Sequence, residues 1–75
     1  YNFHEKVMNM NSRLKEVRLS KGVLIKDVAQ ELGITVSAYA HYEQGIRQPS
    51  IEILKQICIY FDVSADYLIG LSDSY

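Results

Sequence analysis

The residue types and spacing that could do chemistry lie between residues 25 and 45, in the stretch IKDVAQELGITVSAYAHYEQG. Ala29 is small at a point where two successive helices would cross closely, and Gly33, four residues on, permits the positive φ of a sharp turn. Apolar residues that would wedge the two helices together fill the other positions: Val28, Leu32, Ile34, Tyr39 and Tyr42. These seven positions in register predict a helix-turn-helix, whose second helix can enter the major groove of DNA. The chemistry indicated is noncovalent contact with a duplex.

The elements that must position this motif follow from the glycines and the single proline, which divide the chain into segments of helical length. No segment alternates strictly between polar and apolar residues, so strands are not expected. The segments predict five helices. The first runs from residue 11 or 12 to about 20, the second over 25–32, and the third from 35 to 42 or 43. The fourth covers about 51–61 after Pro49 and Ser50, and a short fifth is capped by Ser64. We expect one all-α domain over residues 12–71. Residues 1–11 would be an arm or an extension of the first helix, and residues 72–75 a tail.

Apolar residues recur at helical spacing and define the expected core. Its members are Leu14, Val17, Val28, Ala29, Leu32, Ile51, Leu54, Ile57, Cys58 and Phe61, with Phe3, Val7 and Met10 continuing the stripe of the first helix. The short fifth helix would carry Tyr67, Leu68 and Leu71. The last quarter of the chain holds more apolar residues than the fourth helix can cover. They form either a dimer patch or ordinary exposed surface, and they are Tyr60, Tyr67, Ile69, Leu71 and Tyr75.

Three further stretches extend the pattern: RLKEVRLSKG at 13–22, YEQGIRQPS at 42–50 and FDVSADYLIG at 61–70. Together with the motif they resemble the Cro/repressor-type, or lambda-repressor-like, helix-turn-helix domains over residues 13–70. The resemblance implies a compact five-helix DNA-binding domain in which the second and third helices form the helix-turn-helix. It further implies a cytoplasmic transcriptional regulator, nucleoid-associated when bound, that acts on double-stranded DNA as a homodimer and commonly as a repressor.

The resemblance also assigns roles to individual residues. The recognition helix would span residues 36–42, and its side chains toward base edges would be Val36, Ser37, Ala38 and His41. Contacts to the DNA backbone would come from Thr35, Gln44 and Arg47. Arg18 and Glu43 match positions that form a structural ion pair between the first helix and the end of the third.

Two departures from the family pattern bear on affinity. Leu24 and Ile25 stand where the family usually has a serine or threonine cap followed by a glutamine that contacts the DNA backbone. No lysine or arginine lies between Lys26 and Arg47. With so few cations we expect contacts to only about 3–5 phosphates per subunit, a shallow salt dependence, and a need for dimerisation.

Charge is unevenly distributed along the chain, although the total is −1. Residues 13–26 carry five cations against Glu16 alone, a net +4, and residues 27–75 carry a net −5. Arg13, Lys15 and Lys21 are either a solvated helix face or phosphate contacts, and charge alone leaves both interpretations open.

Length and composition exclude several classes of protein. Seventy-five residues allow one domain, and no apolar run approaches the length of about 20 residues that a membrane helix needs. One cysteine, expected to be buried, and the two histidines His4 and His41 predict neither a metal site nor a cofactor. No phosphate-binding glycine loop or nucleophile–histidine pair is present, so we expect neither an enzyme nor a small-molecule substrate. The rival hypothesis is a helix-turn-helix protein-interaction module or an antitoxin with weak DNA binding.

Overall fold

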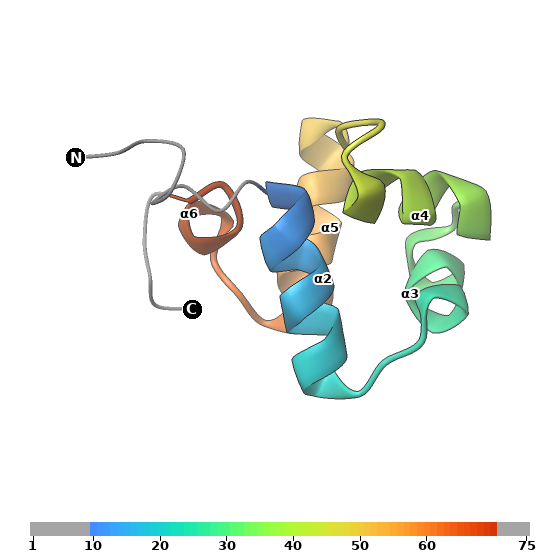
Figure 1. Cartoon of the computed structure of the whole chain (residues 1–75), viewed down its shortest axis with the longest axis horizontal. Helices are drawn as coiled ribbons and strands as arrows, with labels where there is room; N and C mark the ends of the chain where they lie inside the picture. The colour runs from blue at the N-terminus through green and yellow to red at the C-terminus, as the bar shows by residue number, and fades with distance from the viewer. Residues whose placement is uncertain (1–9, 71–75) are drawn as a thin grey trace.

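The computed structural model describes residues 10–70, and in this part of the chain five α-helices and no strands are present (Figure 1). The helices are α2 (Met10–Lys21), α3 (Ile25–Leu32), α4 (Val36–Gln44), α5 (Ile51–Phe61) and α6 (Ala65–Leu68). The all-α fold class is therefore confirmed. Residues 1–9 and 71–75, which include most of the expected arm and the tail, lie outside the described residues. Because α2 already begins at Met10, the expected boundary between residues 11 and 12 falls inside a helix.

Side-chain caps fix where three of the helices begin. The hydroxyl of Thr35 accepts a hydrogen bond from the amide of Ala38 at 3.0 Å, and Ser50 and Ser64 cap α5 and α6 in the same way. A hydroxyl at this position satisfies one of the amides that the first helical turn leaves without a partner. Leu24 holds the corresponding position before α3 and makes no side-chain cap, as the sequence predicted.

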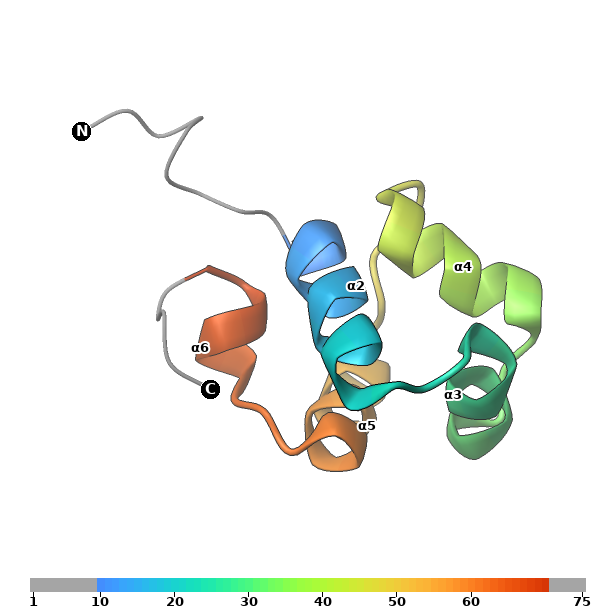
Figure 2. The same ribbon diagram turned by 60° about the horizontal axis from the view of Figure 1, so that its bottom comes forward.

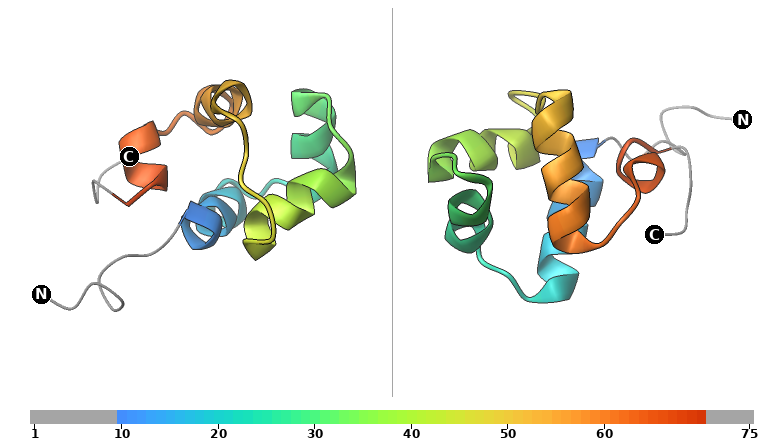
Figure 3. Two further views of the ribbon diagram at one scale, coloured as in Figure 1. Left: turned by 90° about the horizontal axis from the view of Figure 1, so that it is seen from above. Right: turned by 180° about the vertical axis from the view of Figure 1, so that it is seen from behind.

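α2 lies at the centre of the molecule, with α6 on one side and the α3–α4 pair on the other (Figures 1 and 2). α5 packs against α2, α3 and α6, which closes the core from behind (Figure 3). The most deeply buried apolar side chains come from every helix: Leu14, Val17, Val28, Ala29, Tyr39, Ile57, Phe61 and Leu68. The core therefore holds α4 in place through α2 and α3.

Part of the expected core is wrong on α5. Ile51 was expected on the buried face, but the residue is 73% exposed. At about 100° per residue, Ile51 lies about 120° around the helix from the fully buried Ile57, whereas Ile53 lies within about 40° of it. Ile53 accordingly packs against the core in its place. Cys58 is also only partly buried, and this burial raises the pKa of its thiol.

The described helices are all short. The longest, α2, has 12 residues, and none within residues 10–70 is long and apolar enough to cross a membrane.

Candidate nucleic-acid interface

The α3–α4 pair has the geometry of a helix-turn-helix. Gly33 ends α3 in the left-handed conformation at φ 71°, and the amide of Ile34 donates to the carbonyl of Ala29 at 3.0 Å. Ala29 and Tyr39 are both almost completely buried, so α4 lies close against α3 at this point. Because a Cβ at φ 71° is strained, glycine suits this turn. The turn and the buried tyrosine together fix the direction of α4.

The outer side of α4 is open to solvent. Val36 is 51% exposed, and Ser37 and Gln44 are exposed as well, whereas His41 and Ala38 are partly buried. Tyr39 and Glu43 face the core from the opposite side of the helix. α4 also ends at Gln44, one or two residues later than the sequence predicted, which brings Gln44 into the helix.

Thr35 and Arg47 flank α4 at its two ends. Thr35 is exposed, and its hydroxyl holds the first turn of α4 through the bond to Ala38. Arg47 is exposed and follows the left-handed Gly45, with its backbone amide donating to the carbonyl of His41 at 3.3 Å. The side chains with expected roles at DNA therefore lie on one continuous stretch of backbone, from residue 35 to residue 47.

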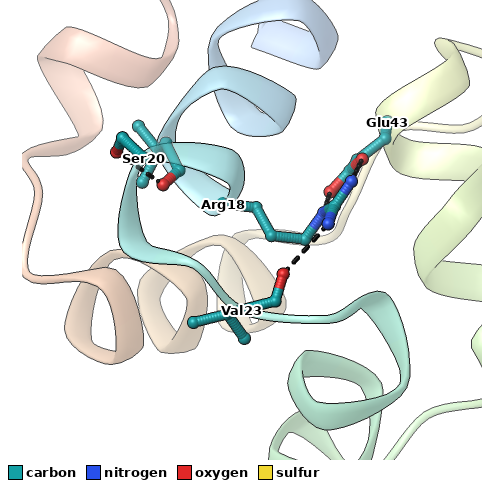
Figure 4. Close-up of polar contacts among 5 residues, drawn as sticks. Arg18, Ser20, Val23 and Glu43 are labelled. Atoms are coloured by element: carbon teal, nitrogen blue, oxygen red, sulfur yellow. Dashed lines mark hydrogen bonds and ion pairs between the residues drawn. The ribbon is translucent and has the colours of Figure 1, made fainter.

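A buried ion pair joins α2 to the end of α4 (Figure 4). Arg18 Nε donates to Glu43 Oε2 at 2.6 Å, and Arg18 Nη2 donates to Glu43 Oε1 at 3.1 Å. Arg18 Nη1 also donates to the carbonyl of Val23 at 3.0 Å, so one guanidinium links α2, the loop before α3, and α4. The hydrogen bond to Glu43 raises the pKa of Arg18 above its ordinary value. The pair has the two-bond geometry that is strongest between arginine and a carboxylate.

The hydroxyl of Tyr39 is buried beside this pair. Within the described part of the chain it has no hydrogen-bond partner of good geometry. Burial above all, and then the negative charge of Glu43, raise the pKa of the phenol far above its ordinary value. Tyr39 is therefore a neutral packing residue, as its wedge position in the sequence predicted.

Removing the Tyr39 hydroxyl tests whether it has a hydrogen-bond partner. We expect Tyr39→Phe to raise the free energy of unfolding by about 1–3 kcal/mol, because a buried hydroxyl without a partner costs about that much. Urea denaturation followed by circular dichroism measures the change. A loss of stability of more than about 1 kcal/mol would instead mean that the hydroxyl donates to Glu43 in solution.

Arg13 is buried, so it is not part of a solvated helix face. Its Nη1 donates to the carbonyl of Tyr67 at 3.0 Å, and its guanidinium carbon lies 4.5 Å from the centre of the Tyr67 ring. These contacts attach α2 to α6 and hold the guanidinium against Tyr67. Lys15 and Lys21 are exposed, so both interpretations of these two residues stay open.

A polar hollow beside α4 was missed by reasoning from sequence. It has a volume of about 220 Å³ and is lined by Met10, Asn11, Tyr42, Gly45, Arg47 and Gln48. A Cβ placed on Gly45 would come within 3.2 Å of the Asn11 side chain, so the start of α2 lies directly against the end of α4. No local pattern connects residues 11 and 45, and this contact becomes visible only in the folded chain.

No candidate metal site accompanies this surface. Among residues 10–70, no three His, Cys, Asp or Glu side chains are grouped so that they could hold a metal ion.

Comparison with known proteins identifies the class of protein that this fold and surface define. A family model described as helix-turn-helix matches residues 14–68, and the chain belongs to the Cro/repressor-type helix-turn-helix family. It is 43% identical over 63 residues to the transcriptional regulator AnsR of Bacillus subtilis, covering 84% of this chain and 53% of AnsR. The chain spans about half the length of the curated relatives it matches.

Two solved structures bound to DNA have the same fold. The P22 c2 repressor in complex with a synthetic operator superposes with a TM-score of 0.82 at 20% identity, covering 88% of this chain and all of the repressor chain. SinR of Bacillus subtilis, the regulator of biofilm formation, was solved with DNA and superposes with a TM-score of 0.72 at 28% identity. That match covers 79% of this chain and 95% of the SinR chain.

Proposed function

We propose that the chain is a sequence-specific, double-stranded DNA-binding transcriptional regulator, a repressor that acts as a homodimer with α4 in the major groove. The observation that carries this proposal is the exposed outer side of α4, held in a fixed direction by the buried Tyr39 and the Arg18–Glu43 pair. The DNA complexes of SinR and of the P22 c2 repressor support it, because both have this fold. A cytoplasmic location with nucleoid association on binding follows from the proposed function.

The proposed roles follow the position of each side chain on α4 and its flanks. Base edges are contacted by Val36, Ser37, Ala38 and His41, and the DNA backbone by Thr35, Gln44 and Arg47. The amides at the start of α4 add a phosphate site, since a helix N-terminus attracts anions. Arg18 and Glu43 hold α4 against α2 and do not contact DNA.

The proposal is tested by titrating the full chain against the DNA upstream of its own gene, with unrelated duplex as competitor. We expect specific binding, and we expect the double variant Ser37→Ala, His41→Ala to weaken it about thirtyfold, since each of the two lost base contacts costs of the order of 1 kcal/mol. Gln56→Ala, an exposed change on α5, is the matched control and should bind like the parent.

The possible outcomes separate function from site assignment. Specific binding that the double variant retains would contradict the roles of Ser37 and His41 while leaving the function in place. Equal binding to upstream and unrelated duplexes would contradict the function itself.

Exposed apolar side chains on α5 support the homodimer. Ile51 and Ile59 are 73% and 80% exposed, and with Leu54, Lys55, Cys58 and Ala65 they line an apolar hollow of about 370 Å³. Tyr67 was expected in the dimer patch, but it is buried against Arg13 and is unavailable for a partner. Leu71 and Tyr75 lie outside the described residues, and Ile69 of the expected patch is 44% exposed. The proposed dimer patch therefore keeps Ile69 and adds the exposed apolar side chains of α5.

A charge on α5 should therefore prevent association. We expect Ile59→Glu to shift the chain from dimer to monomer in sedimentation at micromolar concentration, because burying a carboxylate in an apolar contact is strongly unfavourable. The control is Gln56→Glu, which adds the same charge on the same helix outside the apolar hollow. A parent chain that sediments as a monomer with and without operator DNA would contradict the dimer.

The second candidate function is a helix-turn-helix protein-interaction module or an antitoxin with weak DNA binding. Exposed apolar side chains near the motif favour it, since Leu24, Val36 and Ile46 are 57%, 51% and 65% exposed. Apolar surface of this kind can bind another protein. Equal, weak binding to all duplexes in the titration above is the result that this candidate predicts.

A further inference from the structure

The side of α5 that faces away from the core carries a ridge of three exposed side chains. At about 100° per residue, Lys55 lies about 160° around the helix from the buried Ile57, and Ile51 and Ile59 lie about 40° on either side of Lys55. Side chains four residues apart form the rows that pack into the grooves of a neighbouring helix. Seen from behind, α5 lies between α3 and α6, so this ridge faces solvent (Figure 3, right).

A hollow lies on each side of the ridge, and the two hollows differ in chemistry. On the side of α6 is the apolar hollow of the proposed dimer patch, with Ala65 of α6 in its wall. On the side of α3 is a smaller hollow of about 170 Å³, lined by Glu31, Leu32, Gln56, Ile59 and Tyr60. Ile59 lines both hollows. The smaller one, called the Glu31 hollow below, combines one carboxylate with apolar and aromatic walls.

Lys55 on the ridge and Glu31 in the hollow are complementary in charge. Both side chains are exposed, and within residues 10–70 neither of them forms an ion pair. The long apolar stem of a lysine packs well against apolar walls while its ammonium group pairs with a carboxylate. The ring of Tyr60 offers the ammonium group a further electrostatic contact. The ridge of one copy therefore suits the Glu31 hollow of another in shape and in charge.

We propose that α5 packs against α5 of a second copy about a two-fold axis near Ile59, so that Lys55 of each copy enters the Glu31 hollow of the other. The inference depends on the proposed homodimer, because it names the contact that selects a second copy as the partner. In a two-fold interface the same patch serves both subunits, so each contact occurs twice. Ile59 packs against its own copy at the axis. Lys55 lies about 6 Å further along α5, which keeps the two lysines apart.

The test exchanges the two charges. Lys55→Glu and Glu31→Lys each place like charges together at both contacts of the dimer, and we expect each to raise the dimer Kd about thirtyfold, or about 2 kcal/mol. An equimolar mixture of the two variants restores both attractive contacts, so it should form a heterodimer with a Kd within about threefold of the parent value. Sedimentation equilibrium of the full chain measures these constants. Lys15→Glu and Glu16→Lys, the same charge changes at exposed positions of α2, are the matched controls and should leave the dimer Kd unchanged.

The outcomes separate this inference from the proposed function. A mixture that associates no better than either variant alone overturns the inference, because the weaker association of the single variants then has another cause. A parent dimer whose Kd neither charge reversal changes also overturns it, although the dimer itself stands. A parent chain that is a monomer contradicts the dimer and the inference together. In each of these cases, specific binding to the upstream duplex still supports a DNA-binding regulator.

Discussion

Replacing Arg18 by methionine should lower the free energy of unfolding by about 3–5 kcal/mol, the cost of breaking a buried ion pair from one side. The Arg18 and Glu43 side chains are only 10% and 5% exposed, so the carboxylate that remains would be buried with its principal partner removed. The carbonyl of Val23 would lose a donor as well. Because a domain of this size has a total stability of only a few kcal/mol, a large part of the variant should be unfolded at 25 °C. Urea denaturation followed by circular dichroism measures the change.

Two further variants separate loss of the pair from loss of an ordinary surface cation. Arg18→Met combined with Glu43→Leu should recover most of the stability, since an apolar pair of similar volume often replaces a buried ion pair at little cost. Lys15→Met, an exposed change on the same helix, should stay within about 0.5 kcal/mol of the parent. A single variant Arg18→Met as stable as the parent would show that the pair does not hold α4 to α2.

Features that depend on nearby residues could be predicted from the sequence. Gly33 and Thr35 lie within three residues of each other, and together they end α3 and begin α4 where the sequence indicates. The spacing from Ala29 to Tyr39 also predicts the tight crossing of the two helices, because both residues belong to one motif. The burial of Tyr39 follows from that local geometry.

Features that depend on distant residues could not be predicted in this way. Arg13 and Lys15 lie on the same helix and carry the same charge, yet one is buried against α6 and the other is exposed. The difference depends on Tyr67, 54 residues further along the chain than Arg13. The hollow between Asn11 and Gly45 likewise depends on how α2 meets the end of α4. The role of a cation in this fold is thus decided by which helix packs over it.

Arg13→Ala should lower the free energy of unfolding by about 2–3 kcal/mol while leaving the salt dependence of DNA binding unchanged. The loss of stability combines a hydrogen bond from a charged donor with the stacking of the guanidinium over the Tyr67 ring. α6 has only four residues, and these contacts help to attach it to α2. The salt dependence should not change because a buried side chain neutralises no phosphate. Chemical denaturation measures the first quantity, and DNA titrations at several salt concentrations measure the second.

Arg47→Ala is the control with the opposite expectation, because Arg47 is exposed beside α4. Its removal should leave stability within about 0.5 kcal/mol of the parent and reduce the slope of log K against log salt by about 0.9, the value for one phosphate contact. The parent slope itself should correspond to about 3–5 phosphates per subunit. A slope that falls in Arg13→Ala by as much as in Arg47→Ala would mean that Arg13 leaves Tyr67 and reaches the DNA backbone. The basic segment of α2 would then contribute directly to binding, and the shallow salt dependence expected from an α4 without lysine or arginine would be wrong.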